Sequence, residues 1–163
     1  EQVSGSAWAE CPNGVESAPG TGTMFDYPVN VHRETGSVWI SSDDVPEISG
    51  AGDDEEAAML DGIDGLESAL CLYVERRLPI PMPSPPKTGQ SILRLPALTK
   101  AKAALWNEML AQVVSKASMA RRLDVDRPHV TRLVNMLHRS KIEHVERALA
   151  ILGKRIALQV VAA

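Results

Sequence analysis

Residues 118–134, SMARRLDVDRPHVTRLV, contain two short apolar patterns of helical spacing on either side of an Asp-Val-Asp break. Before the break Met119 and Leu123 lie four positions apart, and after it Val130 and Leu133 lie three apart, so each segment has one face to bury. The pattern predicts two helices joined by a tight turn. Such a pair is either a helix-turn-helix that inserts its second helix into DNA or only the corner of a small helical core.

The turn between the two expected helices has residues suited to each of its positions. Ala120 is small where the helices would touch, and Val125 supplies an apolar side chain inside the turn. Asp124 stands where a helix-turn-helix usually has glycine, and aspartate tolerates left-handed backbone angles better than most residues. Asp126 can cap the second helix, and Pro128 falls in its first turn, where a missing N–H does no harm. The local chemistry therefore favours the helix-turn-helix.

With its apolar residues facing inward, the second helix, expected over residues 127–137, directs polar side chains outward. Arginine can form two hydrogen bonds with guanine, asparagine can do the same with adenine, and threonine can touch thymine or phosphate. We therefore predict base contacts from Arg127, Thr131, Arg132 and Asn135, with His129 at the margin, and phosphate contacts from Ser115, Lys116, Arg139 and Lys141. The alternative is a helical corner whose basic face is only solvated.

The two halves of the chain carry opposite charge, which the net charge of −4 conceals. Residues 1–90 hold 4 basic and 16 acidic side chains, a net charge of −12, whereas residues 91–163 hold 13 basic and 5 acidic ones, a net charge of +8. A basic half suits nucleic acid, and an acidic half suits a basic protein partner. Two domains that merely differ in surface charge would give the same asymmetry.

The first half has the pattern of a small α+β domain. Residues 1–23 have no periodicity and are rich in Gly, Ser, Pro and Thr, so we expect a disordered leader or a segment foreign to the native protein. The extended elements that we expect next are strands at 24–31 and 36–42 joined by a turn at 32–36, a short piece around 47–52, and a strand at 91–96. Gly36 can supply a positive φ at the end of that turn.

A helix over about 54–77 lies among these strands in the sequence. Asp53 or Asp54 can cap its N-terminus, and Gly62 and Gly65 lower its intrinsic propensity, which indicates close packing against the strands. Its apolar stripe consists of Met59, Ile63, Leu66, Leu70 and Tyr73 or Val74. The proline-rich residues that follow, 78–89, cannot continue a helix and predict a stiff extended connection.

From residue 99 onward the pattern turns helical, so we expect one domain over residues 24–97 and a second over residues 98–163. The helices expected in the second domain are 99–113, 116–123, 127–137 and 142–152. Gly153 can end the last helix. RIALQVV at 155–161 then alternates like a strand, which would either pair in a dimer or form a packed edge within the monomer.

Several functional classes lack their signals in this sequence. It has no run of about eighteen apolar residues and no secretory signal at its N-terminus, so we expect no membrane contact and a cytoplasmic protein. Cys11 and Cys71 form no CxxC pair and the histidines have no metal-ligand spacing, so we predict inert thiols, no metal site and no cofactor. We also predict no catalytic residue.

An acidic cluster leaves a metal-dependent nuclease as an alternative. Hydrolysis with a divalent metal would need these carboxylates to converge in space. Consecutive acids in a loop and at a helix N-terminus more often solvate the surface or stabilise the helix dipole. The residues concerned are Asp43, Asp44, Asp53, Asp54, Glu55 and Glu56.

The longer motifs are similar, in order and spacing, to those of one known family. They are YPVNV at 27–31, VWISSDDVPEISGAGDDEEAAMLDGIDGLESAL at 38–70, LPIPMPS at 78–84 and SMARRLDVDRPHVTRLVNMLHRSKIEHVERALAILGKRIAL at 118–158. On these motifs residues 24–158 resemble the HicB antitoxin family, in its version with a C-terminal helix-turn-helix domain.

The resemblance implies an N-terminal domain like a partly degraded RNase H fold, which binds and occludes a small toxin ribonuclease, HicA. It also implies that the C-terminal domain binds double-stranded operator DNA and represses the toxin–antitoxin operon, and that the protein is not an enzyme. We expect a homodimer or higher oligomer, because one short helix contacts too few bases for useful specificity.

The acidic half suits a basic, RNA-cleaving partner, because opposite charges speed encounter and favour the right partner. The candidate toxin-binding residues are Asp43, Asp44, Glu47, Asp53 and Asp54. A ligand-sensing transcriptional regulator without a toxin partner is the other reading of the same sequence.

Overall fold

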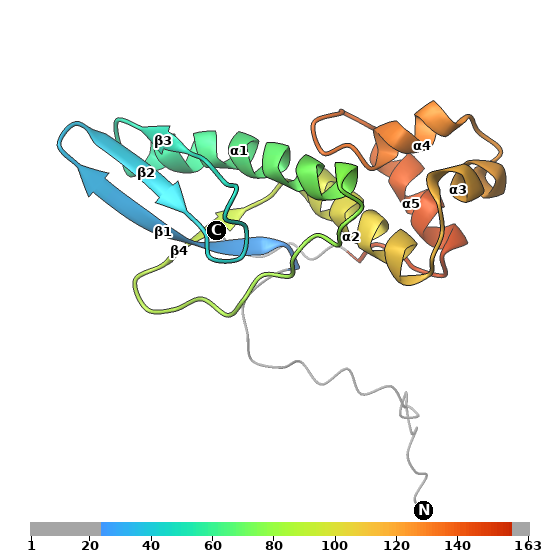
Figure 1. Cartoon of the computed structure of the whole chain (residues 1–163), viewed down its shortest axis with the longest axis horizontal. Helices are drawn as coiled ribbons and strands as arrows, with labels where there is room; N and C mark the ends of the chain where they lie inside the picture. Colours follow the sequence, from blue (N-terminus) through green and yellow to red (C-terminus); the bar gives the residue numbers. More distant parts are fainter. Residues whose placement is uncertain (1–23, 158–163) are drawn as a thin grey trace, which may run out of the picture.

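This computed structural model describes residues 24–157, which form an antiparallel sheet, one long helix packed on it and four shorter helices at one end (Figure 1). The strands are β1 (Asp26–Glu34), β2 (Ser37–Ser41), β3 (Ala51–Gly52) and β4 (Ser91–Arg94). The helices are α1 (Glu55–Glu75), α2 (Ala97–Ala111), α3 (Lys116–Leu123), α4 (Arg127–Leu133) and α5 (Ile142–Ile151). The predicted α+β class is therefore confirmed.

The sheet has the strand order β3-β2-β1-β4, and β1 changes partner along its length. Its first half pairs with β4, from Asp26 opposite Arg94, and its second half pairs with β2, ending at Glu34 opposite Ser37. The β1–β2 turn is therefore shorter than the predicted 32–36, because pairing continues to Glu34. Gly36 has φ +81°, as its place in the turn requires.

Helix α1 packs on the sheet face that carries the inward side chains of β1 and β2. An added Cβ at Gly62 would lie 2.3 Å from Ile40 Cδ1, and one at Gly65 would lie 1.7 Å from the carbonyl oxygen of Ser49. The predicted close approach of the helix to the strands is therefore confirmed at Gly62, whereas Gly65 approaches the loop before β3. Asp54, not Asp53, caps the helix: its Oδ1 accepts from the Ala57 amide at 2.8 Å.

The proline-rich connection forms neither helix nor strand between residues 78 and 88, as predicted, and hydrogen bonds hold it to both parts of the molecule. The Tyr27 hydroxyl of β1 donates to the Pro81 carbonyl at 2.7 Å. From α2, the Trp106 indole donates to the Leu78 carbonyl at 2.8 Å, and Asn107 exchanges two hydrogen bonds with the backbone of Ile80, at 2.7 and 2.8 Å. The proline-rich connection therefore links α2 to β1 of the sheet.

The remaining helices form where they are predicted, but α2 begins and ends two residues earlier than the expected 99–113, and one end of α4 differs more. The expected helix 127–137 ends at Leu133, so its predicted last turn is wrong. The chain leaves the helix there because the backbone makes reverse turns instead, with the Asn135 amide bonded to the Arg132 carbonyl and the His138 amide to the Asn135 carbonyl. Gly153 follows α5 with φ +73°, as expected.

A single cluster of buried apolar side chains runs from Phe25 beside the sheet to Leu152 beyond α5. The boundary at 97/98 stays a prediction, because α2 contributes to both sides of this cluster. Residues 155–157 of the expected last strand have no regular structure, and 158–163, like the leader 1–23, lie outside the described residues. Within residues 24–157 no helix is long and apolar enough to cross a membrane.

Candidate functional site

The corner between α3 and α4 has the geometry that the sequence predicts. Asp124 lies in the left-handed region with φ 57° and ψ 50°, and the Val125 amide donates to the Ala120 carbonyl at 3.0 Å. The side chains packed inside the corner are Met119, Ala120, Leu123, Val130 and Leu133, all buried. Two helices are thus held at a fixed angle around a three-residue turn.

Both helices of the corner begin at side-chain caps. Asp126 Oδ1 accepts from the His129 amide at 2.8 Å, and Ser115 Oγ accepts from the Ser118 amide at 3.1 Å. Ser115 is exposed, so its hydroxyl hydrogen can still reach a ligand outside the protein. The caps remove two unpaired amides and give α4 a defined starting point.

The outer face of α4 is exposed and basic. Arg127, Thr131 and Arg132 lie on it and, with Pro128, line a shallow groove. The Thr131 hydroxyl donates back to the Arg127 carbonyl at 3.2 Å, so its hydrogen is already committed within the helix. This face offers two long cationic donors separated by about one and a half helical turns.

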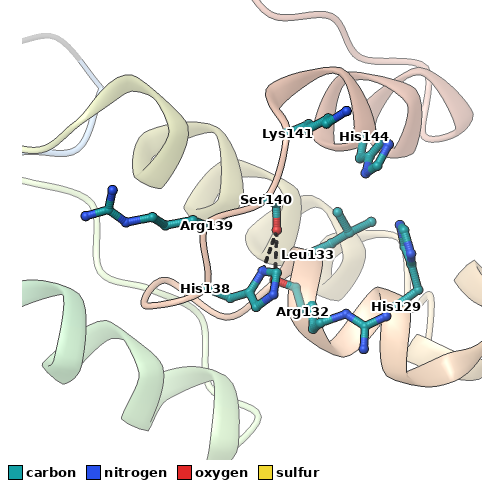
Figure 2. Close-up of a pocket in the computed structure, with 8 residues that line it drawn as sticks. All are labelled: His129, Arg132, Leu133, His138, Arg139, Ser140, Lys141 and His144. Atoms are coloured by element: carbon teal, nitrogen blue, oxygen red, sulfur yellow. Dashed lines mark hydrogen bonds between the residues drawn. The ribbon is translucent and has the colours of Figure 1, made fainter.

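A second hollow, of about 230 Å³, lies between α4, the following loop and the start of α5 (Figure 2). It is lined by His129, Arg132, Leu133, His138, Arg139, Ser140, Lys141 and His144. His129 and His144 approach with ring centroids 5.3 Å apart, and His138 Nδ1 lies 3.1 Å from Ser140 Oγ. Figure 2 shows the Arg139 side chain directed away from the two facing histidines. No acidic residue lines this pocket, so its chemistry suits an anion.

The predicted phosphate-contacting Lys116 is engaged by a neighbouring aromatic ring. Its Nζ lies 5.7 Å from the centroid of Trp106, within reach of a cation–π contact. Burial first, and then the charges of Arg127 and Arg77, lower the pKa of Lys116. It lies at the start of α3, on the side of the corner close to Arg127.

Asn135 is not where the sequence places it. Because α4 ends at Leu133, Asn135 lies in the following loop rather than on the outer helix face with Arg132. Its Oδ1 accepts from the Leu137 amide at 2.9 Å and from the Cys71 thiol of α1 at 3.6 Å. The side-chain oxygen therefore shapes the loop, and the predicted array of four base-contacting residues on one helix is reduced to three.

Sequence reasoning missed Lys102, a lysine of α2 with none of its surface exposed. Its Nζ donates to the carbonyls of Arg132 at 3.3 Å, Asn135 at 2.8 Å and His138. Burial lowers the pKa of Lys102 to about 8, although the charges of Cys71 and Glu67 on α1 oppose this. The signal in the sequence is its spacing: Thr99, Lys102 and Trp106 recur at helical intervals and all point inward.

The acidic candidates form two separate groups. Asp43 pairs with Lys87 at 3.0 Å, and Asp44 accepts from the amide and hydroxyl of Ser84 at 2.9 and 3.1 Å. Glu47 accepts from the Tyr73 hydroxyl at 2.8 Å, near the C-terminal end of α1. The loop that carries these three acids is thus tied to its surroundings by all three of them.

The second group lies at the other end of α1, where exposed Asp53 precedes the cap Asp54. A helix of 21 residues is about 30 Å long, so Glu47 and Asp54 lie at opposite ends of it. The convergence that a metal-dependent nuclease would need is therefore absent from these acids. Within residues 24–157 no group of three or more His, Cys, Asp or Glu side chains could hold a metal ion.

Comparison with known proteins assigns the family. Residues 26–104, which span the sheet, α1 and the first half of α2, match the model of the HicB-like antitoxin of bacterial toxin–antitoxin systems. The Antitoxin HicB of Pseudomonas fluorescens (strain Pf0-1) is 53% identical over 141 residues, covering 86% of this chain and 97% of the relative. This chain belongs to the HicB antitoxin family.

More distant HicB relatives span the same length. Antitoxin HicB 2 of Photorhabdus laumondii is 37% identical over 134 residues, or 81% of this chain and 94% of the relative. Antitoxin HicB of Escherichia coli (strain K12) is 32% identical over 136 residues, or 83% of this chain and 99% of the relative. The similarity to these HicB proteins therefore extends past residue 104 into the helices that form the basic corner.

Proposed function

We propose that this HicB-family protein is an antitoxin that neutralises a HicA-like, mRNA-cleaving toxin through its N-terminal part and represses its own operon through α3 and α4. The identity of 53% to an Antitoxin HicB over nearly all of that relative carries the proposal. The opposite charges of the two halves support it, because a toxin and an operator need different surfaces. We propose a cytoplasmic, non-enzymatic protein without a cofactor.

On this proposal α3 and α4 are a helix-turn-helix, with α4 lying in the major groove of operator DNA. Arg127, Thr131 and Arg132 are the residues that we assign to base edges, because they are exposed on the outer face of α4. His129 at the margin, together with Ser115, Lys116, Arg139 and Lys141, is assigned to the flanking phosphates. Asn135 is assigned to neither role as long as its oxygen is held within the loop.

The pocket of Figure 2 supports a phosphate contact at the end of α4. Arg132 and Lys141 bring positive charge to its wall, and the Ser140 hydroxyl adds a polar group. Since one seven-residue helix covers few base pairs, two copies of the chain would have to bind adjacent half-sites. We therefore propose a homodimer or higher oligomer on DNA.

For the toxin, the N-terminal half supplies acidic surface. Asp44 and Asp54 are occupied by the Ser84 and Ala57 amides, so we assign them a structural role beside the contact surface. The exposed carboxylates of Asp43 and Asp53 are the ones we assign to direct contact with basic toxin residues. Glu47, bonded to Tyr73, supports the loop that presents Asp43.

Co-expression tests the proposal. The chain should restore growth to cells that express the small basic protein encoded beside it, and the purified chain should shift a DNA fragment from upstream of that operon. A ligand-sensing regulator without a toxin partner would shift the DNA and leave growth arrested. Failure of both assays would contradict the proposal as a whole.

A further inference from the structure

The three carbonyls that accept from Lys102 are also the ones that shape the loop between α4 and α5. The Asn135 carbonyl accepts from the His138 amide at 3.2 Å, and the His138 carbonyl accepts from the Ser140 amide at 3.0 Å. The Arg132 carbonyl accepts from the Asn135 amide and from the Ser140 hydroxyl, both at 3.3 Å. Every one of these turns is therefore centred on the same buried ammonium.

We propose that Lys102 is a positioning residue for DNA binding, whose ammonium holds residues 132–140 in the form that presents Arg132, Arg139 and Lys141 to DNA. This inference rests on the proposed function, because those three side chains belong to the proposed DNA surface. Lys102 itself is fully buried and cannot reach a phosphate. Its effect on DNA must therefore pass through the loop that it holds.

The number of donors explains why the residue is a charged lysine. An ammonium has three N–H donors and three carbonyls face it, whereas a neutral amine has only two donors. The positive charge also lies beyond the last turn of α4, where the helix dipole is negative. Loss of the proton thus leaves at least one carbonyl of the loop without its partner.

Two side chains of α1 lie close to Lys102. Cys71 and Glu67 face it from α1, and the Cys71 thiol also bonds Asn135. Glu67 in turn accepts from the Thr99 hydroxyl of α2 at 2.5 Å. A Cys71→Ser background removes the thiol from a pH experiment on the loop and keeps a side-chain donor facing Asn135.

The matched pair of variants is Lys102→Met and Lys154→Met. Methionine fills a similar volume without a buried charge, so the fold should survive the first change. The second removes the same charge from an exposed lysine that pairs with Glu108 at 3.6 Å, away from the loop. Toxin neutralisation should be unchanged in both.

Two readouts are needed, one of them on the free protein. In Lys102→Met we expect faster amide hydrogen exchange at Leu137, His138 and Ser140, and roughly tenfold weaker operator binding, the loss typical of one hydrogen bond to a charged group. Lys154→Met should stay within about twofold of the wild type in affinity, as a distant surface change does. Unchanged exchange and unchanged affinity in Lys102→Met would overturn the inference.

A pH titration of the Cys71→Ser protein tests the same role while Lys102 itself stays in place. Between about pH 7 and about pH 9.5 the carbonyl carbon signals of Arg132, Asn135 and His138 should move together, with a midpoint near 8, and operator affinity should fall over the same range. Operator affinity that falls over this range while the three carbonyl signals stay unchanged would overturn the inference. If the wild-type protein fails to bind its operator, the proposed function is wrong, and so is the role of Lys102 in DNA binding. The amide exchange of Lys102→Met still reports, independently, whether Lys102 holds the loop.

Discussion

Asp124, Asp126 and Lys102 each fix a backbone path by a different means. Asp124 tolerates the left-handed conformation that turns the chain between α3 and α4, and Asp126 pairs the His129 amide in the first turn of α4. Lys102 acts from another helix, on carbonyls 30 to 36 residues away in the sequence. Together they determine where α4 begins, how it is angled and how it ends.

The buried Lys102 makes the free energy of unfolding change with pH in the alkaline range. Its pKa is about 8 when folded and 10.5 ordinarily, so between these values the unfolded chain keeps a proton that the folded chain has lost. The free energy of unfolding should therefore rise with pH in this interval, by up to about 3 kcal/mol from this group. Chemical denaturation of the wild type and of Lys102→Met, compared from about pH 7.5 to about pH 10, measures the difference. Equal slopes for the two proteins would contradict this.

Residues whose partners are close in sequence were predictable, and residues with distant partners were not. The Asp126 cap bonds three positions ahead, and Asp124 obeys its own backbone preference, so both follow from local pattern. Lys102 and Asn135 obtain their partners only when α2, α1 and the loop come together. No local rule states which distant carbonyl or thiol will face such a side chain.

Among the helices and strands, α1 and the sheet are the elements that the sequence pattern predicts most completely. Alternation in β1 and β2, the caps of α1 and its two interior glycines all indicate the same packing. The C-terminal end of α4 was overpredicted because Val134 and Met136 continue an apolar pattern, and both are buried, but in turns rather than in a helix. Periodicity predicts burial at such positions without distinguishing a helix from a folded loop.

The glycine contact between α1 and the loop before β3 can be tested by one methyl group. In Gly65→Ala the new Cβ meets the Ser49 backbone, which cannot rotate away, so we expect destabilisation of about 2–3 kcal/mol. The exposed Ser68→Ala, one turn later on the same helix, is the control and should change stability by less than about 0.5 kcal/mol. Urea denaturation of the two variants measures both. A Gly65→Ala protein as stable as the wild type would contradict the close approach of α1 to the Ser49 backbone.

At the scale of the whole molecule, the two charged surfaces lie at different places on one continuous core. The basic corner is formed by α3, α4 and the start of α5, whereas the acidic groups lie at the two ends of α1. The sequence predicted the separation of charge from counts alone, but it could not predict that the acids divide into two groups, because that depends on the path of the loop after β2. Helix α2 contacts the loop after α4 through Lys102 and the proline-rich connection through Asn107.

Charge complementarity with a basic toxin has a kinetic signature. If exposed acids such as Asp43 and Asp53 attract the toxin, the association rate should fall as ionic strength rises from about 0.05 to about 0.5 M, because the screening length shortens. The dissociation rate should change much less. Stopped-flow mixing of the chain with the purified toxin measures both rates, and a salt-independent association rate would contradict electrostatic attraction.

We propose that one chain carries two separable activities, and the Arg132→Ala variant separates them. Arg132 is exposed on α4, and its side chain lines both the groove and the pocket of the basic corner. We expect operator binding to weaken by about 1–3 kcal/mol in a mobility-shift titration, while the variant still restores growth to cells that express the toxin. A folded Arg132→Ala protein that loses both activities equally, or that binds the operator as tightly as the wild type, would contradict it.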